Sequence, residues 1–330
     1  MDFGQVLSDG IRAAIGIPAV AYALAAIGLN IHFGYTGLLN FGHVAFMLVG
    51  AYGTAIGVTE LGLPLPLAVL VGVVAAVLLA LLLGLPTLRL RAEYLAIVTI
   101  SVAEILRIAV RSQSFEAVTG GPSGIGQWAG PFFRINPIPD GTYGIGSIAF
   151  NANDLWVLAF GWTLILLEIL LVRLLVRSPW GRLLRAVRDD EEVARSLGKN
   201  VFRIKLQSLV LGGVLASFGG MVLAFGADFA DPDLYKSILT FFIYTALILG
   251  GPATVLGPLA GAMIFWFVLQ SLDTLLRQSV SPDSWASAFI DQSDLGAIRF
   301  AIVGLALMVL LVYRPQGLLG DPEEVTIDDR

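Results

Sequence analysis

Cysteine is absent from this sequence of 330 residues, and histidine occurs only twice, at His32 and His43. The absence of cysteine excludes disulfides, thiolate metal sites and a cysteine nucleophile. Two histidines are too few for a histidine-rich metal centre. We therefore predict that the chain binds neither a metal nor any other cofactor of its own.

Charged residues are also scarce. They make up 14% of the chain, whereas a soluble domain carries about a quarter. Hydrophobic residues make up 57%, and the mean hydropathy is +0.83. Several apolar runs approach the roughly 20 residues that cross a bilayer. The sequence therefore predicts an all-α membrane protein, a polytopic helix bundle embedded in a lipid bilayer.

Patterns typical of nucleotide and hydrolytic chemistry are missing as well. No G-x-x-x-x-G-K-[ST] loop occurs, since Lys199 follows Gly198 but precedes an asparagine. Neither H-E-x-x-H nor G-x-S-x-G is present, and no basic patch with interleaved aromatic residues suggests nucleic acid. We predict a chain that is not an enzyme, carries no ATPase site and binds no nucleic acid.

The apolar runs predict nine membrane spans. These spans are Ala13–Leu29, Leu38–Val58, Leu65–Leu85, Tyr94–Val110, Leu155–Val176, Leu206–Phe225, Ile238–Leu249, Leu259–Leu276 and Ile298–Tyr313. A tenth membrane segment is predicted if the glycine-rich stretch Asn30–Gly42 is a broken helix or a re-entrant segment. The choice between nine and ten, and with it the side of the N-terminus, stays open at this point.

One long charged run, Arg177–Lys205, interrupts the apolar blocks. Nine of the twenty Lys and Arg residues fall between positions 173 and 205. By the positive-inside rule, this excess predicts a cytoplasmic loop. The same rule places the C-terminus in the cytoplasm, because Arg314 follows the last predicted span.

Within this run, Pro179 and Gly198 predict the start and the end of a short helix. Leu183, Leu184 and Val187 would give that helix an apolar face able to dock on a soluble partner. Its charged rim would comprise Arg182, Arg185 and Arg188. The alternative that the sequence leaves open is a solvated basic loop that contacts only lipid headgroups.

Two segments differ from simple spans and short loops. Residues 112–154 are rich in Gly and Pro, and we predict that they lie outside the cell and fold partly against the bundle. Residues 321–330 are acidic and are predicted to form a disordered cytoplasmic tail. The remaining residues, 1–320, are predicted to form a single transmembrane domain.

A few polar side chains fall inside the apolar stretches. Asn40 and His43 are three residues apart and share a helix face, and Glu104 can pair in the same way with Arg107. Polar groups that face lipid are costly, so these groups should face the interior of the bundle. For Asn40 and His43 two interpretations stay open, the lining of a transport pathway or hydrogen bonds that only hold helices together. For Glu104, pairing with Arg107 is the favoured interpretation.

Six stretches, taken together and in order, carry a resemblance to a known family. They are Gly28–Tyr52, Pro86–Arg107, Thr119–Ile125, Ser178–Leu206, Gly250–Ala262 and Tyr313–Gly320. Over nearly its full length the chain resembles the membrane permease subunit of bacterial branched-chain amino acid ABC importers. The resemblance implies a type II ABC importer-like permease with several spans in the bacterial inner (plasma) membrane.

The charged run also resembles the E-A-A-x-x-x-G coupling signature of ABC importer permeases. Glu192, Ala194 and Gly198 match its first, third and seventh positions, whereas Val193 departs from the second. The resemblance implies that this loop couples the permease to an ATPase. The coupling residues so implied are Arg182, Leu183, Arg185, Glu192, Ala194 and Gly198.

The resemblance further implies an assembly. Its other parts would be a second homologous permease subunit, two ABC ATPase subunits that bind ATP and Mg, and an external substrate-binding protein. The implied substrates are branched-chain or related amino acids. Two alternatives remain, an ABC permease for urea or short amides, and a stand-alone carrier or channel for a small polar solute. The residues predicted to line the pathway are Asn40, His43, Thr99, Ser101 and Glu104.

Overall fold

The computed structural model describes residues 2–146, 148–280, 295–314 and 316–320, and it is mostly helical. The helices are α1 (Phe3–Ile15), α2 (Ile17–Asn30), α3 (Val44–Thr59), α4 (Leu65–Thr87), α5 (Ala92–Arg111), α6 (Glu116–Thr119), α7 (Gly130–Arg134), α8 (Ala152–Arg177), α9 (Pro179–Asp189), α10 (Glu191–Ser196), α11 (Val201–Ala227), α12 (Ile238–Gly250), α13 (Gly257–Ser279) and α14 (Leu295–Tyr313). The strands are β1 (Ile125–Gly126), β2 (Thr142–Ile145), β3 (Ile148–Asn151) and β4 (Phe229–Ala230). The predicted tail, 321–330, lies outside the described residues.

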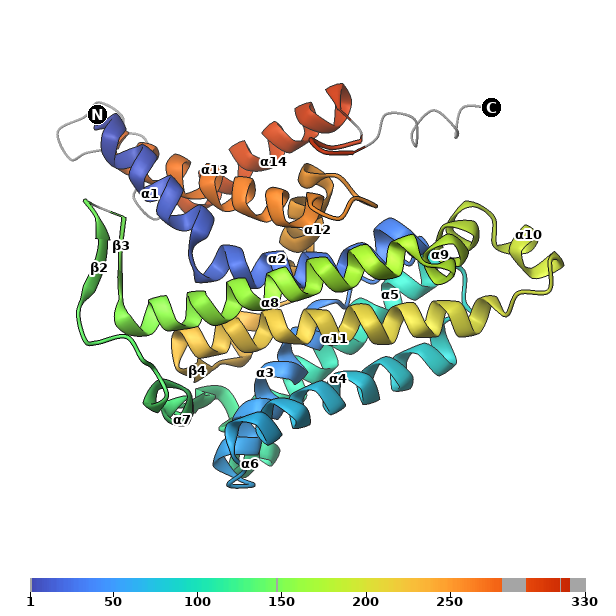
Figure 1. Ribbon diagram of the computed structural model, residues 1–330, viewed down its shortest axis with the longest axis horizontal. Helices are drawn as coiled ribbons and strands as arrows, with labels where there is room; N and C mark the ends of the chain where they lie inside the picture. The colour runs from blue at the N-terminus through green and yellow to red at the C-terminus, as the bar shows by residue number, and fades with distance from the viewer. Residues whose placement is uncertain (1, 147, 281–294, 315, 321–330) are drawn as a thin grey trace.

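The long helices α4, α8 and α11 run side by side along the molecule, and short elements gather at its two ends (Figure 1). The end that carries α9 and α10 is called the α9 end below. The opposite end carries α6 and α7 and is called the α7 end. A π-helical turn, Ile31–Tyr35, extends α2 toward the α9 end.

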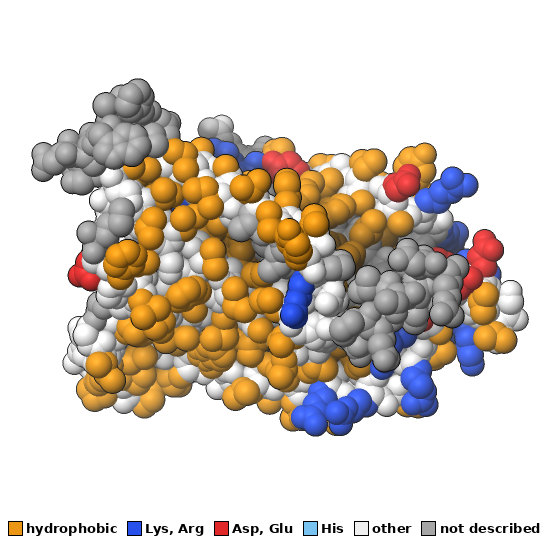
Figure 2. Space-filling model, turned by 90° about the horizontal axis from the view of Figure 1, so that it is seen from above, with side chains coloured by type: hydrophobic (Ala, Val, Ile, Leu, Met, Phe, Trp, Pro, Cys, Tyr) orange, Lys and Arg blue, Asp and Glu red, His pale blue; other side chains and the backbone are white. Residues whose placement is uncertain are grey.

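Among the described residues, five helical segments are long and apolar enough to cross a membrane: α2 with its π turn, α4, α8, α11 and α13. The helices α3 and α12 and the first part of α14 are apolar but shorter. Figure 2 shows a lateral surface dominated by hydrophobic side chains, with most of its Lys and Arg side chains toward the α9 end. These features confirm the predicted helical membrane class. The number of spans, nine or ten, stays a prediction.

The first helix, α1, corrects the predicted start of the first span. That span was predicted to begin at Ala13, but the helix breaks at Gly16, whose backbone is extended, and α2 starts only after it. The polar side of α1 faces α13, where Thr274 donates a hydrogen bond of 3.1 Å to Asp9. Its apolar side is exposed, an inside-out arrangement that suits contact with lipid. The exposed large side chains are Phe3, Leu7 and Ile11.

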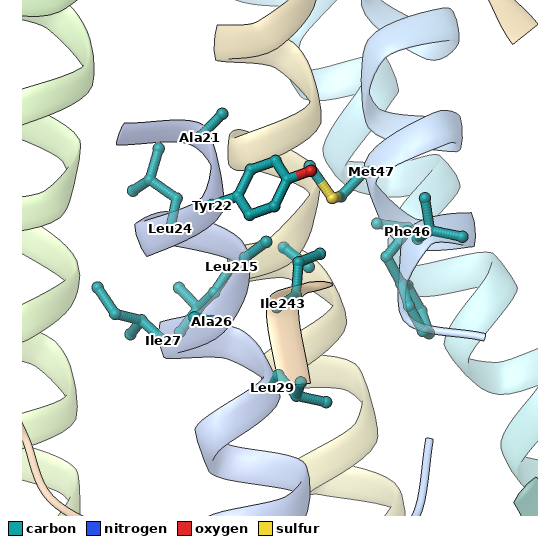
Figure 3. Packing of buried hydrophobic residues seen from close by; sticks show 14 of the residues in the cluster. Ala21, Tyr22, Leu24, Ala26, Ile27, Leu29, Phe46, Met47, Leu215 and Ile243 are labelled. Carbon is teal, nitrogen blue, oxygen red and sulfur yellow. The ribbon is translucent and has the colours of Figure 1, made fainter. Parts of the chain in front are cut away.

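The core of the bundle forms around α2. Helix α11 packs most extensively against α2 and α3, and α12 and α13 also contact α2. Tyr22 and Ile27 of α2 lie in one buried cluster with Met47 of α3, Leu215 of α11 and Ile243 of α12 (Figure 3). Nearly all of α2 is buried, and its many alanines let the neighbouring helices approach closely.

Glycines set a close contact between α2 and α11. A Cβ atom built on Gly28 of α2 would lie 2.3 Å from the carbonyl oxygen of Gly212 in α11. A Cβ atom built on Gly212 would lie 2.4 Å from the carbonyl oxygen of Gly28. Both obstacles are backbone atoms and cannot rotate aside. The two helices therefore meet at a separation that only glycine allows.

The Gly- and Pro-rich residues 112–154 pack against the α7 end of the bundle. Trp128 and Phe132 are almost fully buried, and their ring centroids lie 4.9 and 4.4 Å from that of Phe225 in α11. Strand β1 pairs with β4, which follows α11, and β2 pairs with β3 in a hairpin. The backbone N–H of Ala129 donates to the side chain of Asp228, 2.8 Å away. This segment is thus held to α11 by both packing and hydrogen bonds.

Replacing Gly212 by alanine should destabilise the bundle, because the new methyl group would overlap backbone atoms of α2. We expect a loss of about 1–3 kcal/mol in the free energy of unfolding, measured as a lower Tm of the purified protein in detergent. The matched control is Gly304→Ala in α14, where a built Cβ meets no atom within 4 Å. Equal Tm values for the two variants would contradict the proposed glycine contact.

Candidate functional site

The charged run Arg177–Lys205 forms two helices where the sequence predicted one. The predicted helix from Pro179 to Gly198 breaks at Asp190, whose backbone is extended and which separates α9 from α10. The Asp190 side chain accepts hydrogen bonds from the backbone N–H groups of Glu192 and Val193, at 2.8 and 2.9 Å. Aspartate is a favoured N-cap residue, so it starts a new helix here.

The predicted apolar docking face of α9 points into the protein, which corrects the prediction. Leu184 and Val187 are buried, and Leu183 is half-buried. Helix α9 packs on α8, α11 and the π turn, so its apolar side completes the core. The guanidinium of Arg185 donates to the carbonyl oxygen of Val176, 3.1 Å away at the end of α8. Of the predicted coupling residues on α9, Arg182 is the exposed one.

The exposed apolar side chains of this region lie on and just after α10. Val193 is 55% exposed and Leu197 is 73% exposed. Among the residues that match the coupling signature, Glu192 is exposed and Ala194 is buried. Gly198 has a φ of +75°, a left-handed conformation that favours glycine at the end of a helix. The part of the run that can meet a soluble partner is therefore α10.

Arg188 joins α9 to the π turn that ends α2. Its guanidinium donates a hydrogen bond of 2.7 Å to the carbonyl oxygen of Gly34, and its side chain lies against Gly37. Gly37 has a φ of +72°, so a side chain there would be strained as well as crowded. The sequence analysis placed Arg188 only on a charged rim. Its contact with α2 could not be read from the sequence because 154 residues separate it from Gly34.

The segment between the π turn and α3, residues 37–43, is not helical, yet most of it is buried. Asn40 and His43 are almost fully buried in it. The Asn40 amide lies 3.2 Å from Nδ1 of His32, and its oxygen accepts from the backbone N–H of Gly42. Nε2 of His43 lies 2.8 Å from the carbonyl oxygen of Ala25 in α2. The stretch Asn30–Gly42, left open by the sequence as a broken helix, is thus interrupted, and side-chain hydrogen bonds surround the interruption. The second span, predicted from Leu38, becomes helical only at Val44, so the prediction that Asn40 and His43 share a helix face is wrong.

Helix α5 supplies one further group to this segment. The hydroxyl of Thr99 accepts a hydrogen bond of 3.1 Å from the backbone N–H of Phe41 and is buried. Ser101, two residues later, is exposed and donates to the carbonyl oxygen of Ile97 in its own helix. The structure therefore brings Asn40, His43 and Thr99 together and leaves Ser101 outside that group.

Glu104 lies in a separate charged cluster nearer the α7 end. Arg107 donates to both of its carboxylate oxygens and, at 2.9 Å, to Asp233. Ser237 donates to Glu104 as well, at 3.2 Å. Arg111 and Lys236 lie 3.6 and 3.7 Å from Asp233. The favoured interpretation from the sequence, pairing of Glu104 with Arg107, is confirmed.

Asn30 makes a connection that the sequence analysis missed. Its amide nitrogen donates to the carbonyl oxygen of Thr254, 2.7 Å away, and its amide oxygen accepts from the backbone N–H of Ala253 at 2.8 Å. One side chain at the end of α2 thus satisfies two backbone groups in the turn between α12 and α13. The last residues of α12, just before that turn, contact the C-terminal segment, since the backbone N–H groups of Leu318 and Leu319 donate to the carbonyls of Leu249 and Gly250.

Comparisons with known proteins agree on one family. The family model described as branched-chain amino acid transport system / permease component matches residues 13–312. The high-affinity branched-chain amino acid transport system permease protein LivM of Salmonella typhimurium is 30% identical over 92% of this chain and 69% of its own. LivH of Escherichia coli is 26% identical over 92% of each chain. The probable LivM of Methanocaldococcus jannaschii is 21% identical over 92% of each. No solved structure matches the chain.

Replacing Asn30 by leucine should destabilise the protein, because it leaves the Ala253 N–H and the Thr254 carbonyl without this partner. An unsatisfied buried polar group costs about 1–3 kcal/mol. We expect a lower Tm in detergent and faster proteolysis of the turn between α12 and α13. Asn153→Leu is the control, since Asn153 is exposed and its hydrogen bond to Asn136 lies at the surface. If both variants melt together with the wild type, the bridge through Asn30 does not stabilise the fold.

Proposed function

The chain belongs to the branched-chain amino acid transport permease family, and from that membership we propose that it forms the membrane pathway of an ATP-driven ABC importer for branched-chain amino acids. It is a multi-pass membrane protein and a transport subunit rather than an enzyme. Its relatives are named for branched-chain amino acid transport. That naming disfavours urea, short amides and a stand-alone carrier as alternatives.

The proposed assembly contains two homologous permeases, two ATPase subunits and an external binding protein. The match to both LivM and LivH supports a pair of related permease chains. The ATPase subunits would bind ATP and Mg, because the sequence holds no phosphate-binding loop. The excess of Lys and Arg in Arg177–Lys205 supports a cytoplasmic α9 end and a cytoplasmic C-terminus.

The observation that carries this proposal is the difference in exposure between α9 and α10. Its α9 part is packed into the bundle, whereas its α10 part presents Val193 and Leu197 outward beside Glu192. Exposed apolar side chains on a short helix with a charged surround are typical of a protein docking surface. We assign this surface to the ATPase, with Arg182, Leu183, Arg185, Ala194 and Gly198 as the residues that hold or flank it.

The route of coupling follows from the contacts of α9. Force applied to α10 reaches α9 and, through the hydrogen bond from Arg188 to Gly34, the π turn of α2. The next residues along the chain are the non-helical segment that contains Asn40 and His43. π turns are rare, and they often lie at functional positions. In the proposed mechanism, the ATPase moves this segment and so opens and closes the pathway.

The proposed pathway lining is neutral and polar. Asn40, His43 and Thr99 offer amide, imidazole and hydroxyl groups that suit a zwitterionic amino acid without binding it tightly, and the binding protein would supply the selectivity. In the structure these groups bond to the protein itself, so a substrate would have to replace those partners. Ser101 and Glu104, also predicted as lining residues, lie apart from this group.

Leu197→Glu should separate the ATPase from the permease. Leu197 is 73% exposed, so the change places a charge on the docking surface and leaves the core intact. We expect at least tenfold less ATPase to co-purify with the permease, and a matching loss of leucine uptake in proteoliposomes. The control is Ile145→Glu, at a side chain 90% exposed in strand β2. Uptake by this chain alone without ATP would contradict the proposal.

Arg188→Gln should uncouple the ATPase without releasing it. The change removes the charged hydrogen bond to Gly34 but leaves α10 unaltered. We expect ATP hydrolysis and ATPase co-purification within twofold of the wild type, and leucine uptake per ATP reduced at least tenfold. The control is Arg173→Gln, an exposed arginine of α8. Normal uptake per ATP in Arg188→Gln would show that force does not pass through this contact.

A further inference from the structure

A basic pocket lies at the α9 end, outside the segment that contains Asn40 and His43. Its volume is about 880 Å³. The turn between α4 and α5 forms one wall, and α10 with the start of α11 forms the other. The lining residues used below are Arg89, Leu90, Arg91, Arg195, Lys199 and Phe202.

Unpaired positive charges outnumber unpaired negative charges in the lining of this pocket. Arg195 is paired with Glu191 at 2.9 Å, and Lys205 also contacts Glu191. Within the described ranges, Arg89, Arg91 and Lys199 form no ion pair. In the lining, these three cations therefore meet one carboxylate outside the pairs of Glu191, that of Glu192. Helix α11 begins at this pocket, and the positive end of its dipole adds to the same potential.

Apolar groups accompany these cations. The guanidinium carbon of Arg89 lies 5.6 Å from the centre of the Phe202 ring, and Leu90 is 43% exposed. The pocket thus combines positive charge with hydrocarbon at one place. This combination suits a ligand that is itself anionic at one end and apolar at the other.

A row of exposed apolar side chains on α4 leads directly to this pocket. Its members recur every three or four residues, so they follow one face of the helix. The first and last are 18 positions apart, about 27 Å at 1.5 Å per residue, which is close to the roughly 30 Å of a bilayer's hydrocarbon core. The helix ends at Thr87, two residues before Arg89. The row comprises Leu67, Leu70, Val74, Leu78, Leu82 and Leu85.

We propose that this pocket binds the headgroup of an anionic phospholipid. Arg89, Arg91 and Lys199 would contact the phosphate, and one acyl chain would lie along the exposed row of α4. The continuity of the row with the pocket favours a lipid over an acidic protein segment, which would approach from water and leave the row unused. Basic pockets at the ends of membrane helices are suited to anionic headgroups. Glu192 and Gly198 line this pocket and also belong to the proposed ATPase surface, so the inference requires that the docked ATPase leaves the side of Arg89 and Arg91 open to the membrane.

The test uses the full transporter in nanodiscs that contain phosphatidylglycerol and phosphatidylcholine in equal amounts. The lipid retained by the protein after delipidation is measured by mass spectrometry. The wild type should retain phosphatidylglycerol preferentially, and the triple variant R89Q/R91Q/K199Q should lose at least tenfold of that preference. The control R203Q removes an exposed charge of α11 that lies outside the pocket lining, and it should retain the preference.

The lipid retained by each variant decides between the proposal and its alternatives. An unchanged preference in the triple variant overturns the proposal, and if ATPase co-purification falls at the same time, the pocket is a protein contact instead. Inorganic phosphate alone, added at millimolar concentration, should not displace the lipid, because the acyl chain contributes to binding. Displacement by phosphate would show a site for free anions and would also overturn the proposal. If the triple variant unfolds, the single variants R89Q and K199Q are measured in its place.

Discussion

Backbone groups that leave the helical pattern inside an apolar bundle need other partners, and the segment between α2 and α3 faces this constraint most directly. Asn30 bonds to the turn between α12 and α13. Arg188 of α9 takes the carbonyl of Gly34, and Thr99 of α5 takes the N–H of Phe41. Each partner comes from a different part of the chain. The irregular segment therefore ties α5 and α9 to α2, and Asn30, at the end of α2, adds the α12–α13 turn.

The two ends of the molecule are held in different ways, and the difference suits a device driven from one end. At the α7 end, strand pairing, stacked aromatic rings and the ion pairs around Asp233 act together. At the α9 end, α9 packs on the bundle, and the irregular segment itself is held by side-chain hydrogen bonds, among them the one from Arg188 to Gly34. A few such bonds can exchange at a cost of a few kcal/mol, whereas packed aromatic rings cannot rearrange one at a time. In the proposed mechanism, the irregular segment moves while the α7 end stays fixed.

The sequence predicted helices well where a long run of apolar residues determines them. The predicted span Leu65–Leu85 differs from α4 by two residues at one end, because an apolar run in a membrane has no alternative to a helix. The sequence did not predict the break between α9 and α10, and it wrongly predicted that Leu184 is exposed for docking. Apolar residues face lipid as readily as the core in such proteins, so hydrophobicity alone could not show which side of α9 is inside. That information lies in contacts with distant segments.

Helix geometry alone excludes one combination among the predicted pathway residues. Thr99 and Ser101 are two positions apart, about 200° around an α-helix, so they could not both face one pathway. Thr99 points to the segment between α2 and α3, and Ser101 is exposed. Glu104 lies further along the same helix, in the ion pairs with Arg107. By contrast, Asn40 and His43 both lie beside His32, at 3.2 Å from its Nδ1 and at 5.2 Å between ring centroids. The chain around them is not helical, and side-chain hydrogen bonds that no periodic pattern encodes fix their positions.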